Sequence, residues 1–131
     1  MKKTTIPTWI STALARAIHQ QQLTLHGGLD GVRDEGLFAS ALARPRQLHT
    51  YGDPPPDVFA LAAAYAFGLA RNHAFLDGNK RTAYVVCRLF LKLNGRDVAA
   101  TQEEKYLTFL RLAEGDLTED ALAAWLRAHG K

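Results

Sequence analysis

An uninterrupted apolar stretch, residues 58–70, constrains the fold of this chain more than any other feature. At thirteen residues it is too short to span a bilayer, but its length suits a buried helix. Because its side chains are apolar nearly all round, such a helix has no face that prefers water. We therefore expect it at the centre of a helical domain, covered by the rest of the chain.

Glycine and proline divide the chain before this stretch into two helices and a loop. Pro7 fits the first turn of a helix that runs to about Gln22 with apolar residues along one face. Three glycines in residues 27–31 disfavour any regular element and predict a loop. Asp34 is a favoured cap for a short helix, which we expect to end before Pro45.

The apolar stretch and the segment after it predict the third and fourth helices. Residues 53–56, which contain three prolines, form a stiff entry to the central helix, which ends at about Arg71. The next helix runs from about Asn79 to Asn94, where Gly95 provides the stop.

The C-terminal third of the chain predicts two further helices. Thr101 and Glu104 have the spacing of a capping box at the start of the fifth helix, and Thr118 caps the sixth. Residues 96–100 are the one piece that we expect to be extended. The predicted fold class is therefore all-α, a single-domain bundle of about six helices over residues 1–131.

Composition places the chain among ordinary cytoplasmic proteins. Its 131 residues suffice to bury roughly two-thirds of the unfolded surface in one core. The net charge is +3 but the cations are scattered, which disfavours direct nucleic-acid binding. A lone cysteine, Cys87, excludes an internal disulfide and favours a reducing compartment. The N-terminal sequence has no hydrophobic signal core, and we expect no membrane association.

The run from His73 to Thr82 carries the chemistry of the chain, because it joins the third and fourth predicted helices. The first N–H groups of a helix have no partner within it, and the helix dipole adds positive potential there. Gly78 would allow a ligand to approach the backbone closely. Lys80 and Arg81, with the amide of Asn79, would surround this end with donors, so phosphate is the expected guest.

Two other residues of the run suggest catalysis. Asp77 has the carboxylate that a magnesium ion prefers beside phosphate oxygens. His73 is suited to remove a proton near neutral pH, since an unperturbed histidine has a pKa of about 6.5. Phe75 lies between them and is expected to anchor the loop in the core.

Each of these residues has an ordinary structural alternative. His73 alone would more often be a partly buried structural histidine, and Asp77 alone would more often cap a helix. Gly78 with Asn79 is a turn signal, and adjacent cations are commonly solvated. Their joint presence at one helix start favours the functional interpretation.

The run resembles the signature of the Fic/Doc (Fido) family, H-x-F-x-[DE]-G-N-[GK]-R. The matching positions are His73, Phe75, Asp77, Gly78, Asn79, Lys80 and Arg81. Residues 27–37, 40–45 and 91–95 are similar to the Doc branch, the "death on curing" toxins of bacterial toxin–antitoxin pairs. The resemblance thus covers nearly the whole chain.

This resemblance implies a mostly helical Fido fold and transfer of a group from ATP to a protein hydroxyl. It assigns His73 as the general base and Asp77 as the ligand of Mg²⁺. The residues that it assigns to ATP binding are Gly78, Asn79, Lys80 and Arg81, with Arg71 in a supporting role.

Two departures from the AMP-transferring Fic pattern favour the Doc branch. Lys80 stands where those enzymes have glycine, and Tyr84 stands where they have a second arginine. Tyrosine cannot replace the bidentate phosphate clamp of arginine. In the Doc branch ATP presents its γ-phosphate, so the resemblance implies a kinase for a threonine or serine, with elongation factor Tu as the expected target. An AMP-transferase remains the alternative.

The resemblance also implies a toxin of a type II toxin–antitoxin system, which arrests translation and growth. The chain lacks the [ST]-x-x-x-E-[GN] pattern of self-inhibited Fic proteins, so we expect restraint by a separate short antitoxin. Its C-terminal segment would fold as it binds. A catalytically silent binding module is a further alternative, against which the intact His73, Asp77 and Asn79 argue.

Overall fold

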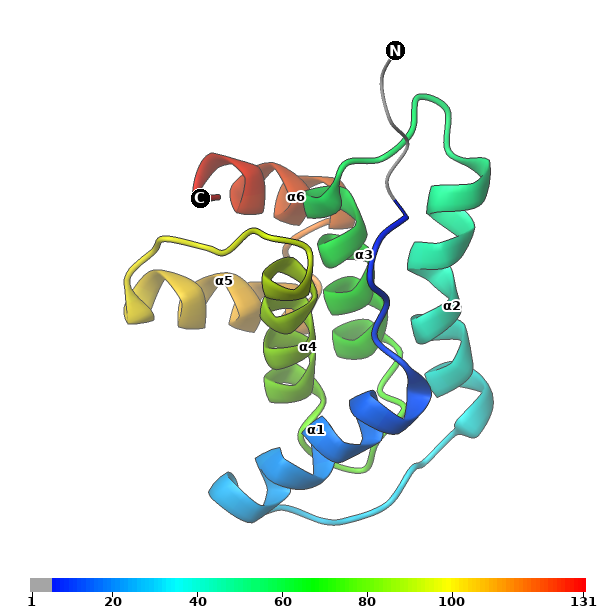
Figure 1. The fold of residues 1–131 in the computed structure, drawn as a ribbon. Coiled ribbons are helices and arrows are strands. Elements are labelled where there is room, and N and C mark those ends of the chain that lie inside the picture. The colour runs from blue at the N-terminus through cyan, green and yellow to red at the C-terminus, as the bar shows by residue number, and fades with distance from the viewer. Residues whose placement is uncertain (1–5) are drawn as a thin grey trace.

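The computed structural model describes residues 6–131, which form six helices and no sheet (Figure 1). In chain order the helices are α1 Thr12–His26, α2 Glu35–Tyr51, α3 Val58–Arg71, α4 Asn79–Leu93, α5 Gln102–Glu114 and α6 Glu119–Ala128. Extended pairing in the described residues is limited to two isolated bridges, Val32 with Phe75 and Val98 with Gly130. The predicted all-α fold class is confirmed.

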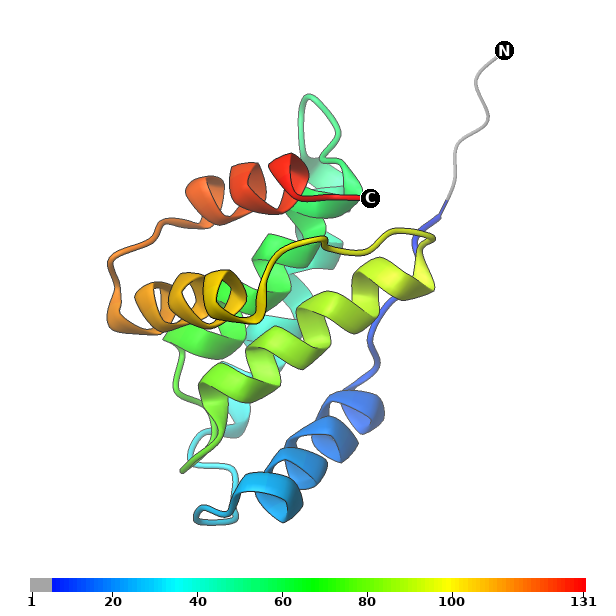
Figure 2. The ribbon, with the colours of Figure 1, turned by 90° about the vertical axis from the view of Figure 1, so that its left-hand side faces the viewer.

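The apolar helix α3 lies at the centre, as its sequence predicts. It packs against α2, α4, α5 and α6, and α1 lies against α4 (Figures 1 and 2). Gly68 allows α2 to come close, because a Cβ at this position would lie 3.0 Å from the Cα of Ala41. Burial raises the pKa of the Cys87 thiol on α4 to about 12, so this cysteine stays protonated in the core.

The predicted end of the second helix is wrong. Helix α2 does not stop before Pro45 but continues to Tyr51, with the proline ring buried inside it. A proline within a helix loses one backbone hydrogen bond. The last turns still gain contacts, because Leu48 packs on the core and His49 meets the edge of Trp9 at 5.5 Å between ring centroids. These tertiary contacts therefore outweigh the tendency of Pro45 to end the helix.

The predicted bounds of the first helix, Pro7 to Gln22, are also wrong. Helix α1 begins after Ser11, whose side chain accepts the N–H of Leu14, and it ends at His26 before Gly27. Residues 6–10 are not helical, since long-range bonds hold their backbone instead. The N–H of Ile10 donates to the hydroxyl of Tyr65 at 3.0 Å, an interaction that local sequence cannot reveal.

Five of the six helices begin with a side-chain cap. The capping residues are Ser11, Asp34, Asp57, Thr101 and Thr118. Thr101 and Glu104 form the predicted capping box, and the predicted caps at Asp34 and Thr118 are confirmed. Helix α4 is the exception, because its N-cap is Gly78, which has no side chain to accept a backbone N–H.

The segment predicted to be extended, residues 96–100, forms the bridge between Val98 and Gly130. Beside it Asp97 pairs with Arg88 at 3.1 Å. Arg88 lowers the pKa of this carboxyl to about 2, with help from the N–H of Val98. No helix among residues 6–131 combines the length and the apolar character needed to cross a membrane.

Candidate active site

The loop between α3 and α4, residues 72–78, is built around the buried ring of Phe75. This ring packs against Phe38 of α2 at 5.1 Å between centroids, which confirms its predicted role as an anchor. Asn79, the first residue of α4, then closes the loop. Its side-chain oxygen accepts the N–H of Phe75 at 3.0 Å, and its amide donates to the Phe75 carbonyl at 2.9 Å. The backbone N–H of Asn79 has no acceptor among residues 6–131 and can face a ligand.

The glycine-rich loop at residues 27–34 lies along the loop of residues 72–78, here called the motif loop, and holds it from outside. The N–H of Arg33 donates to the Ala74 carbonyl at 2.7 Å, and the N–H of Leu76 donates to the Gly31 carbonyl at 3.1 Å. Gly28 permits the close approach, because its φ is 124° and a Cβ there would lie 3.1 Å from the Cβ of Asp77. Two loops far apart in sequence thus form one unit.

His73 is exposed at the edge of this unit. Its φ of 50° is unusual for a residue other than glycine and is worth explaining. The side chain of Arg33 secures this conformation, since its Nε–H donates to the His73 carbonyl at 2.8 Å and its second amino group to the Asn72 carbonyl at 3.3 Å. The imidazole is therefore carried on a backbone held from both neighbouring peptides. The alternative of a partly buried structural histidine does not hold.

The start of α4 presents backbone donors without protein partners. Gly78 adopts the left-handed conformation with φ 80° and ψ 12°, directly before the helical residue Asn79. Within residues 6–131, no acceptor pairs with the backbone N–H of Gly78, Asn79, Lys80 or Arg81. Successive N–H groups in such a turn form a concave site for an anion, and the helix dipole favours negative charge there.

Asp77 lies next to these donors with an exposed side chain. It does not cap α4. One carboxylate oxygen instead accepts the N–H of Leu29 at 2.8 Å, which orients the group and leaves the other oxygen available. The described residues contain no group of three or more side chains that could hold a metal by themselves. Magnesium commonly binds one or two carboxylates together with substrate phosphates, so the single carboxylate of Asp77 fits this ion.

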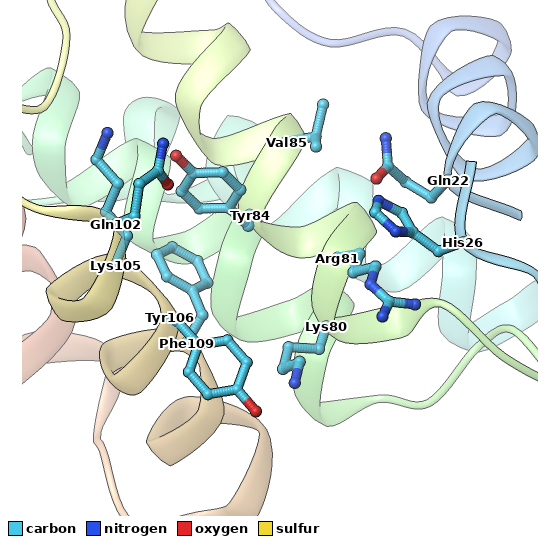
Figure 3. Close-up of a pocket in the computed structure, with 10 residues that line it drawn as sticks. All are labelled: Gln22, His26, Lys80, Arg81, Tyr84, Val85, Gln102, Lys105, Tyr106 and Phe109. Carbon is cyan, nitrogen blue, oxygen red and sulfur yellow. The ribbon is translucent and has the colours of Figure 1, made fainter.

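A cavity of about 360 Å³ lies beside the start of α4, between α1, α4 and α5 (Figure 3). Its lining consists of Gln22, His26, Lys80, Arg81, Tyr84, Val85, Gln102, Lys105, Tyr106 and Phe109. Lys80 and Arg81 thus belong both to the helix start and to the cavity. The ammonium of Lys80 lies 4.8 Å from the centre of the Tyr106 ring, and Tyr84 meets the edge of Phe109 at 5.1 Å. The volume is typical of a small-molecule pocket.

His73, Asp77, Gly78 and Asn79 do not line this cavity, and neither does Arg71. It is exposed at the end of α3, where its guanidinium lies over Phe67 and against Gly115, the residue after α5. Its supporting role in ATP binding stays a prediction. Sequence reasoning missed the contribution of α1 and α5 to the cavity, and it missed Arg33 as a support of His73. The only signal for Arg33 was its place in a stretch similar to the Doc branch.

The all-helical fold and the loop between α3 and α4 define a class of protein, and comparison with known sequences names that class. Residues 9–91 match the Fic/DOC family. This chain belongs to the Fic/Doc family.

Two relatives place it within that family. It is 34% identical to "Protein kinase doc" of Escherichia phage P1 over 111 residues, 85% of this chain and 86% of that protein. It is 51% identical to "Toxin Doc" of Mycolicibacterium smegmatis over 75 residues, 56% of this chain and 57% of that protein, so this match spans little more than half of the relative. These similarities identify a Doc-type member of the family and support a Doc-type protein kinase.

Proposed function

We propose that this chain is the toxin of a type II toxin–antitoxin system and transfers the γ-phosphate of ATP to a threonine or serine of a translation factor. Elongation factor Tu is the expected target. The observation that carries the proposal is the uncapped start of α4, where free N–H groups, Lys80 and Arg81 adjoin a loop that exposes His73. A phosphate group and an acceptor hydroxyl could meet there.

The proposed reaction follows from the roles of these residues. The backbone N–H groups from Gly78 to Arg81 and the side chains of Lys80 and Arg81 bind the phosphates. His73 takes the proton of the acceptor hydroxyl, whose oxygen forms a bond to the γ-phosphorus. The bond from this phosphorus to the bridging oxygen of ADP breaks, and ADP leaves. Magnesium, held by Asp77 and the phosphates, would supply charge neutralisation.

The nucleoside of ATP would occupy the cavity between α1, α4 and α5. Lys80 and Arg81 line it, so a nucleotide with phosphates at the helix start extends naturally into it. The exposed ring of Tyr106 offers stacking surface for a base, and Gln102 offers a donor and an acceptor. Replacing Tyr106 with alanine should weaken binding of a magnesium–ATP analogue, measured by calorimetry. Replacing the exposed Tyr51 of α2 provides a control.

Tyr84 favours kinase over AMP-transferase activity. It lines the cavity at the position where AMP-transferring relatives are expected to have arginine, and a phenol cannot clamp a phosphate as a guanidinium does. Incubation with elongation factor Tu and ATP labelled at either the α or the γ position distinguishes the reactions. We expect label from the γ position only. Label from the α position on the target would contradict the kinase.

A separate antitoxin completes the proposal, with its C-terminal segment folding on the surface of this chain. A toxin that acts on a translation factor would work in the cytoplasm. Expressed alone, the chain should stop growth and protein synthesis, and co-expression of its antitoxin should restore both. The His73→Ala variant should leave growth unaffected at equal protein level. Growth arrest by that variant would instead indicate the catalytically silent binding module.

A further inference from the structure

His19 on α1 is a buried polar side chain that the proposed reaction does not use. It is 2% exposed, although histidine is commonly found only partly buried. Its ring stacks on Phe75 at 3.7 Å between centroids and 8° between planes. Its Nε2 lies 2.8 Å from the backbone carbonyl oxygen of Asp77. The histidine therefore contacts the motif loop through both its face and its edge.

The contact with Asp77 fixes where the proton of this ring resides. A carbonyl oxygen only accepts hydrogen bonds, so Nε2 must carry the hydrogen and donate it. Helix α1 packs against α4, so the ring belongs to an element outside the motif. The donor is thus held by a rigid helix rather than by the loop that it orients.

The orientation of the Asp77–Gly78 peptide follows from this bond. The carbonyl of a trans peptide and the N–H of the next residue point in opposite directions. His19 holds the Asp77 carbonyl on the side of α1, and therefore the Gly78 N–H points away from α1. This N–H has no acceptor within residues 6–131, and it is the first of the open donors at the start of α4.

The stacked ring also explains why Gly78 sits so close to α1. A Cβ at Gly78 would lie 3.4 Å from Cδ2 of His19, so the imidazole forms the floor beneath the turn. A flat ring supports the turn without filling the space on the ligand side. Phe75 is itself held by the side chain of Asn79. Its ring stacks on the imidazole of His19 and keeps that imidazole in its plane.

We propose that His19 is a positioning residue that aims the Gly78 N–H at the phosphate of the bound nucleotide. It acts through the Asp77–Gly78 peptide and touches neither the substrate nor the reacting atoms. This inference rests on the proposed function, since it assumes that a phosphate occupies the start of α4.

Two variants separate the hydrogen bond of His19 from its ring. His19→Phe keeps the stacked ring but loses the donor, whereas His19→Gln places an amide donor near the position of Nε2. Because one hydrogen bond changes affinity by about fivefold to tenfold, His19→Phe should raise the KM for ATP by that factor and leave kcat at saturating ATP nearly unchanged. His19→Gln should recover most of the loss.

His129 provides a matched control. Its Nδ1 also contacts a backbone carbonyl, that of Trp125, at 2.8 Å, but it follows α6 and lies outside the ATP cavity. His129→Phe should therefore leave the KM for ATP unchanged. An equal rise of KM in both phenylalanine variants, or a fall of kcat alone in His19→Phe, would overturn the proposal.

Nuclear magnetic resonance tests the orientation of the peptide without any nucleotide. In the parent chain, the ¹⁵N shifts of His19 should report a protonated Nε2 at neutral pH. The amide resonance of Gly78 should move in His19→Phe and stay close to the parent position in His19→Gln. An unprotonated Nε2, or a Gly78 resonance that ignores the phenylalanine, would refute the role of His19. If these results hold but the parent fails to bind magnesium–ATP, the proposed function is wrong and the orientation of the peptide stands.

Discussion

The starts of α4 and α5 differ in what happens to the backbone N–H groups that have no partner within the helix. At α5 the hydroxyl of Thr101 accepts the N–H of Glu104, and the carboxylate of Glu104 accepts the N–H of Thr101. At α4 the N-cap is Gly78, and its neighbours' N–H groups have no acceptor within residues 6–131. A helix end that is closed contributes stability, whereas one that is left open can bind an anion.

Both helix starts also follow segments that are held by residues distant in sequence. Before α5, the N–H of Ala99 donates to the His129 carbonyl at 2.7 Å, and Val98 pairs with Gly130. The loop before α4 is braced by His19 from α1, by the backbone of Arg33 and by the side chain of Asn79. Long-range contacts thus precede both helix starts, and of the two starts α5 alone has a side-chain cap. The two helix starts therefore differ in the cap itself, and at α4 the supporting contacts reach Asp77, the residue directly before the N-cap.

The largest expected effect is the loss of phosphate transfer in His73→Ala. General bases of this kind contribute about a hundredfold to ten-thousandfold to a rate, and His73 is exposed. Transfer of γ-label to the target should fall by that factor, while the unfolding temperature and the affinity for ATP stay near the parent values. A variant that retained full activity would remove His73 from the mechanism.

Substituting Gly78 tests the open end itself. Gly78 and Gly95 flank α4 and have left-handed φ values of 80° and 83°. Alanine at either position should destabilise the chain by about 1 kcal/mol, because an L-residue is strained there. Only Gly78→Ala should also weaken binding of a magnesium–ATP analogue, by about tenfold, because the N–H of residue 78 would no longer point at the phosphate.

Calorimetry on both glycine variants shows whether backbone strain or the loss of a phosphate contact weakens ATP binding. If Gly95→Ala weakened ATP binding as much as Gly78→Ala, the cause would be general destabilisation. The start of α4 would then not be the phosphate-binding site. Space is not the cause at Gly95, because a Cβ there would meet no atom within 4 Å.

The capped end should respond in the opposite way. Thr101→Ala removes the hydroxyl of the capping box, and loss of such a cap costs about 1 kcal/mol of unfolding free energy. Denaturant titration should detect this loss, while the affinity for ATP should stay unchanged. A clear fall in ATP affinity would mean that the two helix starts are coupled.

The smallest expected effect concerns pH and lies away from both helix starts. Arg88 lowers the pKa of Asp97 in the folded chain from 3.8 to about 2. The pair therefore contributes fully above pH 3.8, and its contribution disappears as the pH falls through 2. The stability difference between the parent and Asp97→Asn should shrink over this interval. A difference that stays constant from pH 5 to about pH 2 would contradict the assigned pair.

The sequence predicted those features that depend on neighbours along the chain. The central helix, the capping box and the anchored Phe75 each follow from a local pattern, and the structure confirms them. The end of α2 could not be predicted, because the helix continues past Pro45 on the strength of contacts with distant residues.

The support of the candidate site was hidden for the same reason. His19 and Asp77 are 58 positions apart, and Arg33 and His73 are 40 apart. No motif in the sequence around His19 marks it as functional. Its role depends on how α1 packs on α4, which no periodicity in the sequence encodes.

The most direct test of the account is a titration of the ¹⁵N-labelled chain with a magnesium–ATP analogue. The backbone amide resonances of Gly78, Asn79 and Lys80 should shift strongly, together with those of the cavity residues on α5 such as Tyr106. The amides of Thr118 and Glu119, at the capped start of α6, should not respond. Shifts confined to other surfaces, with the amides of residues 78–80 unchanged, would contradict the claim that the open end of α4 binds the phosphates.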